Sequence, residues 1–125
     1  MMSTILQVAL GGAIGSAARY LTGLAVLRAF GHGFPLGVLV ANVIGSFLMG
    51  LFAVWAGRNA MTHLSPFVMT GLLGGYTTFS AFSLETLTLI ERGQMGSAAL
   101  YMVLSVGGAI GALFAGSVLA RGIWA

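Results

Sequence analysis

Four long stretches without a charged side chain constrain the fold of this sequence more than any other feature. They cover residues 1–18, 29–57, 59–84 and 93–120. A helix needs ~20 mainly apolar residues to cross the hydrocarbon core of a bilayer. The sequence therefore predicts an all-α integral membrane protein, with one domain over residues 1–125 and four transmembrane helices at about 3–29, 35–57, 65–90 and 94–121.

The composition supports a membrane protein and argues against an enzyme. Of the 125 residues, 58% are hydrophobic and 6% are charged, and the mean hydropathy is +1.04. The chain has no cysteine, and its carboxylates and imidazoles are limited to Glu85, Glu91, His32 and His63. No two of these stand at a metal-ligand spacing, so catalytic chemistry is not expected. The five arginines are scattered, which does not favour a nucleic-acid partner.

The third predicted span contains a segment that is poorly suited to a helix. Gly74-Gly75 is followed by Tyr76, Thr77 and Thr78, all weak helix formers. We predict a break near Gly74–Thr78 and a restart at about Phe79, capped by Thr77, Thr78 or Ser80. In lipid, freed backbone groups persist only when they are buried in protein or line a wet cavity. The alternative is a plain glycine-tolerant kink.

Aromatic and hydroxyl side chains recur on shared helix faces around this break. Phe79 and Phe82 are three residues apart, and so are Ser80 and Ser83. In the fourth span, Tyr101 and Ser105 are four apart. These faces either line a pathway or serve packing. For Tyr101, anchoring at the membrane interface is the alternative.

Two polar residues lie inside otherwise apolar spans. Asn42 in the second span either joins helices by hydrogen bonds or lines a pathway. Arg19 in the first span either faces a vestibule or extends to the interface. Glu85, in the second half of the third span, is either a pathway acid or a residue near the helix end.

Small residues at helical spacing predict close helix packing. The pairs and stripes are Gly11/Gly15, Gly12/Ser16, Gly37/Ala41/Gly45, Gly108/Ala112/Gly116 and Gly107/Gly111. Such spacing lets helix backbones approach each other in lipid.

The arginines near the span ends give no preferred orientation in the membrane. Arg58 and Arg121 flank one side, and Arg28 and Arg92 flank the other. Positive residues usually mark the cytoplasmic side, so this balance permits insertion in both directions. An antiparallel homodimer is then natural, because four spans cannot easily enclose a pathway alone.

Three motifs follow one another along the chain: Gly11-Gly12-x-x-Gly15 with Arg19-Tyr20; Pro35-x-Gly37-x-Leu39-x-x-Asn42-x-x-Gly45; and Gly71-x-x-Gly74-Gly75-x-Thr77-Thr78-Phe79-Ser80-x-Phe82 with Glu85. In order and spacing they resemble the Fluc/CrcB fluoride channel family, and the resemblance extends over all four spans.

The resemblance implies a dual-topology, antiparallel homodimer in the bacterial inner membrane that exports fluoride passively through two pores. The residues that it implies for the fluoride pathway, together with hydroxyls that could donate to the ion, are Asn42, Phe79, Phe82, Ser80, Tyr101, Ser105 and Arg19. It further implies one structural sodium ion, bound by the backbone carbonyls of Gly74 and Thr77.

The sequence departs from the family pattern at three positions. Val38 and Ala81 stand where threonine is common, and Ala109 stands where some members carry another hydroxyl. The first bears on how fluoride enters, and the third shortens the polar face of the fourth span.

Two other classes of protein compete with the channel. A small four-span drug or cation exporter resembles the chain in size, but residues 1–30 lack the carboxylate that its proton exchange would use. A non-transport tetraspan assembly protein would use the glycines only for packing.

Overall fold

The computed structural model describes residues 2–31 and 33–123, and every regular element within them is helical. The elements are α1 (Met2–Phe30), α2 (Leu36–Arg58), the short η1 (Thr62–Leu64), η2 (Pro66–Leu73), α3 (Gly74–Tyr76), α4 (Phe79–Glu91) and α5 (Met95–Ile123). Helices α1, α2 and α5 are each long and apolar enough to cross a membrane. These helices make the chain a helical membrane protein. Its predicted third span is divided into η2–α3 and α4.

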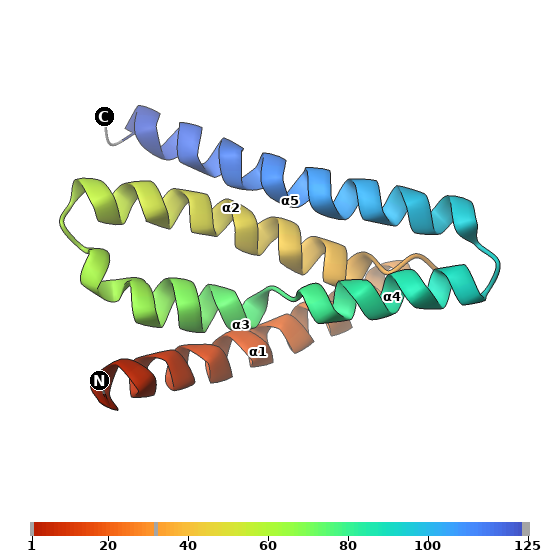
Figure 1. The fold of residues 1–125 in the computed structure, drawn as a ribbon, viewed down its shortest axis with the longest axis horizontal. Helices are drawn as coiled ribbons and strands as arrows, with labels where there is room; N and C mark the ends of the chain where they lie inside the picture. The colour runs from red at the N-terminus through yellow and green to blue at the C-terminus, as the bar shows by residue number, and fades with distance from the viewer. Residues whose placement is uncertain (1, 32, 124–125) are drawn as a thin grey trace.

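Successive long segments run in opposite directions along the length of the molecule (Figure 1). The start of α1, the turn that contains η1 and the end of α5 lie at one end of the molecule. The α1–α2 and α4–α5 connections lie at the opposite end. This alternation agrees with the sides predicted from the order of the spans.

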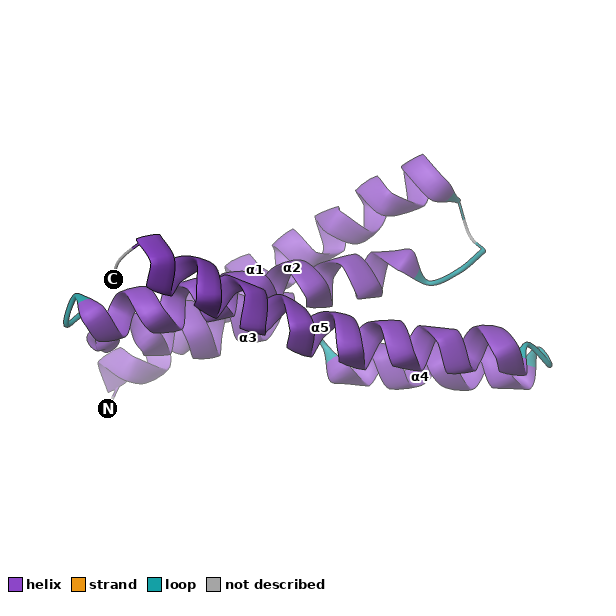
Figure 2. Cartoon of the chain, turned by 90° about the horizontal axis from the view of Figure 1, so that it is seen from above, coloured by secondary structure: helices purple, strands orange, loops and turns teal. Residues whose placement is uncertain are grey.

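Helix α2 is the central element of the packing. It lies along α5 over much of its length and also contacts α1 and η2, while α1 packs against η2 and α3. Within the described part of the chain, α1 does not pack against α4 or α5. The second half of α1 diverges from α4 and α5 (Figure 2).

Glycines allow the closest backbone approaches. A Cβ on Gly15 would collide with the Leu72 carbonyl of η2, and one on Gly116 of α5 would collide with the Phe47 carbonyl of α2. A Cβ on Gly11 would lie 2.5 Å from the Phe67 carbonyl oxygen. These contacts confirm two of the predicted packing faces, Gly11/Gly15 and Gly108/Ala112/Gly116, whereas Gly107 and Gly111 have no neighbour within 4 Å.

Left-handed glycines end two of the helices. Gly31 (φ 81°) follows α1, and Gly93 (φ 76°) follows α4. After α4, the N–H groups of Gly93 and Gln94 donate to the carbonyls of Ile90 and Leu89, at 3.0 and 2.9 Å. This pattern is the Schellman motif, which closes the last turn of a helix.

Helix η2 has the wider turns of a π-helix, and the sequence did not predict this. It begins at Pro66, one residue after the predicted start of the third span at about residue 65. π-Helical turns are rare and frequently occur at functional sites. Here the wide turns lie against α1 and lead directly into the break.

The glycine contacts generate a stability prediction. Gly15→Ala should destabilise the fold by about 1–3 kcal/mol, because the new methyl group overpacks a backbone contact. Gly107→Ala is the matched control, since its methyl group would meet open space. Thermal unfolding in detergent measures both variants. Equal melting temperatures would contradict the assigned α1–η2 contact.

Candidate functional site at the helix break

The third segment breaks at Thr77 and Thr78. Their backbones are extended, with φ/ψ of −89°/158° and −155°/123°. Helix α4 then begins at Phe79, as the sequence predicted. Of the three candidate caps, Thr78 is the one used: its hydroxyl accepts a hydrogen bond from the Ala81 N–H at 3.1 Å. The Thr78 hydroxyl also lies 3.2 Å from that of Ser80.

The predicted extent of the break, Gly74–Thr78, was too long. Gly74, Gly75 and Tyr76 remain helical and form α3. Gly75 packs on α1, where a Cβ would lie 2.7 Å from the Gly12 carbonyl oxygen. The glycine pair therefore allows close packing and does not itself end the helix.

Asn42 of α2 contacts the break directly. Its Oδ1 accepts a hydrogen bond from the Thr78 N–H at 2.8 Å, and its Nδ2 donates to the Thr78 carbonyl at 3.0 Å. A single amide side chain thus satisfies both backbone groups of the extended residue. Of the two roles considered for Asn42, joining helices is the one that this geometry describes. An amide nitrogen carries two hydrogens, so one N–H of Asn42 remains available after these two hydrogen bonds.

The carbonyl groups at the end of α3 are only partly satisfied. Arg19 of α1 donates from Nε to the Gly75 carbonyl at 3.2 Å. The Thr77 N–H and hydroxyl both donate to the Leu73 carbonyl at 3.0 Å. Among the described residues, no donor reaches the carbonyl oxygens of Gly74 and Thr77.

The two phenylalanines after the break lie together. Their ring centroids are 5.3 Å apart, which agrees with the shared face predicted from their spacing. Phe82 is buried and packs on Tyr101 of α5, with centroids 5.2 Å apart. Phe79, by contrast, is 75% exposed in the single chain. The pair thus extends from the core to an open face.

Tyr101 and Ser105 form a buried polar pair on α5. Their side chains are 0% and 6% exposed, and neither hydroxyl has a hydrogen-bond partner among the described residues. The interfacial-anchor interpretation of Tyr101 is wrong, because the ring lies in the core between Phe82 and Phe34. Buried polar groups normally have a partner, so two adjacent free hydroxyls require an explanation.

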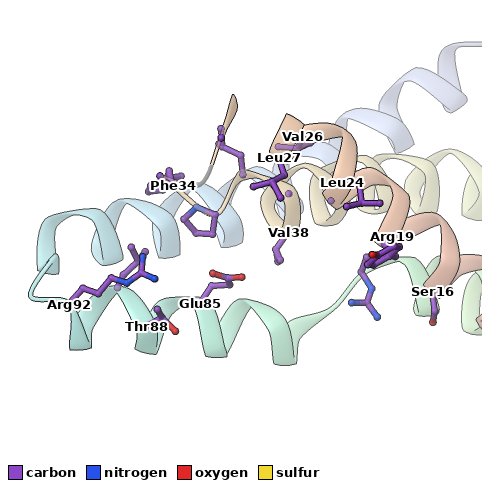
Figure 3. Close-up of a pocket in the computed structure, with 18 residues that line it drawn as sticks. Ser16, Arg19, Leu24, Val26, Leu27, Phe34, Val38, Glu85, Thr88 and Arg92 are labelled. Carbon is purple, nitrogen blue, oxygen red and sulfur yellow. The ribbon is translucent and has the colours of Figure 1, made fainter. Parts of the chain in front are cut away.

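A groove of about 730 Å³ opens between the second half of α1, the start of α2 and α4. Arg19, Glu85 and Arg92 line it, and Figure 3 shows their side chains around the same space. Val38, the position without the expected hydroxyl, also lines it. Arg19 also donates from Nε to the Gly75 carbonyl, and its vestibule role stays a prediction.

Sequence reasoning missed several members of this region. It did not assign Phe34, which meets the Tyr101 ring edge-on at 5.5 Å, or Arg92, which it treated only as an arginine near a span end. It also missed the hydrogen bond of 2.8 Å between the Thr22 and Tyr76 hydroxyls. No spacing rule pairs residues from different helices, so the sequence gave no signal for these contacts.

Comparison with known proteins identifies the family. The family model described as "CrcB-like protein, Camphor Resistance (CrcB)" matches residues 6–117. A Ruegeria protein named "Fluoride-specific ion channel FluC" is 62% identical over 124 residues, 98% of each chain. Proteins of the same name from Roseobacter denitrificans and Paracoccus denitrificans are 56% and 49% identical over 125 residues, covering 98% and 100% of this chain and 99% and 100% of their own. The chain therefore belongs to the CrcB family.

Proposed function

We propose that this protein is a fluoride-selective ion channel, not an enzyme, which lets fluoride leave the cell passively and so lowers cytoplasmic fluoride. The observation that carries the proposal is the pair of buried, unpartnered hydroxyls, Tyr101 and Ser105, beside the Phe79–Phe82 pair. The relatives named as fluoride-specific channels support the choice of ion.

The chemistry of these groups suits a small, strongly hydrated anion. A pore must replace the hydrogen bonds that water makes to the ion, and hydroxyl groups and the second N–H of Asn42 can donate them. Ser80, exposed at the start of α4, is a further donor. The edge of a phenyl ring carries positive partial charge, so Phe79 and Phe82 offer C–H contacts. Arg19 is assigned to the vestibule that leads to this pathway.

The working unit in this proposal is an antiparallel, dual-topology homodimer in the bacterial inner membrane. Two features of the single chain support it. Phe79 of α4 is 75% exposed and Tyr20 of α1 is 67% exposed, and α1 and α4 do not pack on each other within the described chain. The arginines are balanced between the two sides, with Arg58 and Arg121 against Arg28 and Arg92. A second, inverted copy would cover the apolar surface.

A structural sodium ion is proposed at the carbonyls of Gly74 and Thr77. These two carbonyl oxygens suit a sodium ion. Within the described chain neither accepts a hydrogen bond, and both lie where a helix ends. Unwound carbonyls and the C-terminal ends of half-helices coordinate sodium in other membrane proteins. When bound, the ion would neutralise the negative end of the half-helix dipole.

Two alternatives remain as outcomes of the tests. A drug or cation exporter would need a carboxylate in α1, and α1 contains none. A tetraspan assembly protein would predict that changes at the site alter stability without altering the flux of any ion.

Fluoride efflux from liposomes, read with an electrode beside a chloride control, tests the main proposal. The unmodified chain should release fluoride and retain chloride. Phe82→Ile should suppress fluoride release while the protein remains folded, because the aliphatic side chain lacks the positive ring edge. Leu87→Ile, on a 49% exposed position of α4, is the matched control. Full flux through folded Phe82→Ile would remove this residue from the pathway.

Removal of the buried hydroxyls should separate function from stability. Tyr101→Phe and Ser105→Ala should lower fluoride flux but leave the melting temperature unchanged or higher, since no hydrogen bond to another described residue is lost. Unfolding scans on the same preparations provide the comparison. A loss of stability with normal flux would indicate a structural role instead.

The sodium site makes a separate prediction. Thr77→Ser should keep sodium binding, because the site uses the backbone carbonyl and serine retains the hydroxyl that donates to Leu73. Binding is measured as the rise in melting temperature when sodium replaces choline at constant ionic strength. Abolished binding would point to the threonine methyl group, which packs on Gly45.

A further inference from the structure

One side chain, Asn42, holds two consecutive peptide groups at the break. The first peptide group joins Thr77 to Thr78, and its N–H donates to Asn42 Oδ1 at 2.8 Å. The second joins Thr78 to Phe79, and its carbonyl accepts from Asn42 Nδ2 at 3.0 Å. Because both are fixed from the same direction, Asn42 determines how each peptide plane is turned.

The orientation of the first plane has a direct consequence for the Thr77 carbonyl. A trans peptide group is planar, and its C=O and N–H point in opposite directions. No peptide bond is cis in the described residues. Since the Thr78 N–H points at Asn42 on α2, the Thr77 C=O of the same plane points away from α2. This is one of the two carbonyls that no donor reaches.

The second plane orients the start of α4 in the same way. The Thr78 C=O points towards Asn42, so the Phe79 N–H points away from it. Phe79 is the first residue of α4, and the first N–H groups of a helix have no partner within that helix. Asn42 therefore sets the direction of two groups at once. One is the Thr77 carbonyl, where the sodium ion is proposed to bind, and the other is the Phe79 N–H at the start of α4, where a helix favours an anion.

The remaining contacts of Thr77 do not fix its carbonyl. Its hydroxyl and N–H both bond to Leu73, and its methyl group faces Gly45, one turn along α2 from Asn42. These contacts locate the residue, but its peptide plane towards Thr78 can still turn. Among the described residues, Asn42 is the side chain that stops this rotation.

We propose that Asn42 is a positioning residue that sets the direction of the Thr77 carbonyl and thereby the sodium affinity of the break. The inference rests on the sodium site proposed above. It assigns Asn42 a role that is separate from any contact with fluoride, since the hydrogen bonds that hold the peptide planes leave one N–H of its amide free.

The test compares Asn42→Ala with Asn42→Asp by sodium titration and by hydrogen exchange at the Thr78 amide, both without fluoride. Asn42→Ala loses both hydrogen bonds and should bind sodium about tenfold more weakly, with faster exchange at Thr78. Asn42→Asp is nearly isosteric: it keeps the acceptor for the Thr78 N–H, which sets the Thr77 carbonyl, and loses only the donor to the Thr78 carbonyl. It should therefore bind sodium at least as tightly as the unmodified chain and keep Thr78 protected.

Asn59→Ala is the matched control. Its amide likewise donates to a backbone carbonyl, that of Trp55 at 2.9 Å, but on the exposed end of α2. This variant should leave sodium affinity and Thr78 exchange unchanged. A general effect of losing an asparagine hydrogen bond would appear here as well.

The outcomes distinguish the two proposals. Normal sodium affinity in folded Asn42→Ala, or its loss in Asn42→Asp, would overturn the role of Asn42 alone. Should Asn42→Ala fail to fold, the Asn42→Asp result and the protection of Thr78 in the unmodified chain decide the question. An unmodified chain that does not respond to sodium would overturn the sodium site itself, and this inference with it.

Discussion

The structure depends on how one interrupted helix satisfies its backbone hydrogen bonds in an apolar surrounding. In the hydrocarbon core, an unpaired N–H or C=O costs several kcal/mol. Of the two extended residues, Thr77 donates its N–H to Leu73 of its own segment, whereas Thr78 needs partners from outside that segment. Asn42 of α2 supplies both partners for Thr78, and Arg19 of α1 supplies one for the preceding turn. These contacts allow the break to persist.

Close packing and hydrogen bonding come from the same helix faces. Gly45 lies three residues after Asn42 and contacts Thr77, while Gly15 lies four residues before Arg19 and contacts η2. Because residues three or four apart share a face, the glycine brings the backbones together where the polar side chain must reach. A larger residue in place of either glycine would move the donor away from its acceptor.

The break also separates two kinds of chemistry. On its N-terminal side, helix-end carbonyls gather, and Gly74 and Thr77 keep theirs without a donor among the described residues. On its C-terminal side lie the start of α4, the phenyl rings and the two free hydroxyls of α5. Carbonyl ends of half-helices favour cations and N–H ends favour anions. The proposed sodium and fluoride sites therefore lie on opposite sides of the same interruption.

The charge-free stretches determined the helical membrane fold, because only a segment that satisfies its own hydrogen bonds can cross lipid. Spacing along one segment likewise placed Phe79 with Phe82, and motif order indicated the family. The sequence did not predict which residues form the break with the same accuracy. Gly74 and Gly75 suggested a longer interruption, but both remain helical, and Gly75 packs closely on α1.

Partners across segments were decided by the tertiary structure alone. The sequence marked Asn42, Arg19, Tyr101 and Ser105 as polar residues in apolar spans, but not what each one meets. The fold joins Asn42 to Thr78 and Arg19 to Gly75, and leaves the two hydroxyls of α5 free of any described partner. The physical reason is that helical periodicity describes one segment at a time, whereas a hydrogen bond between helices depends on their rotation and separation, which packing sets.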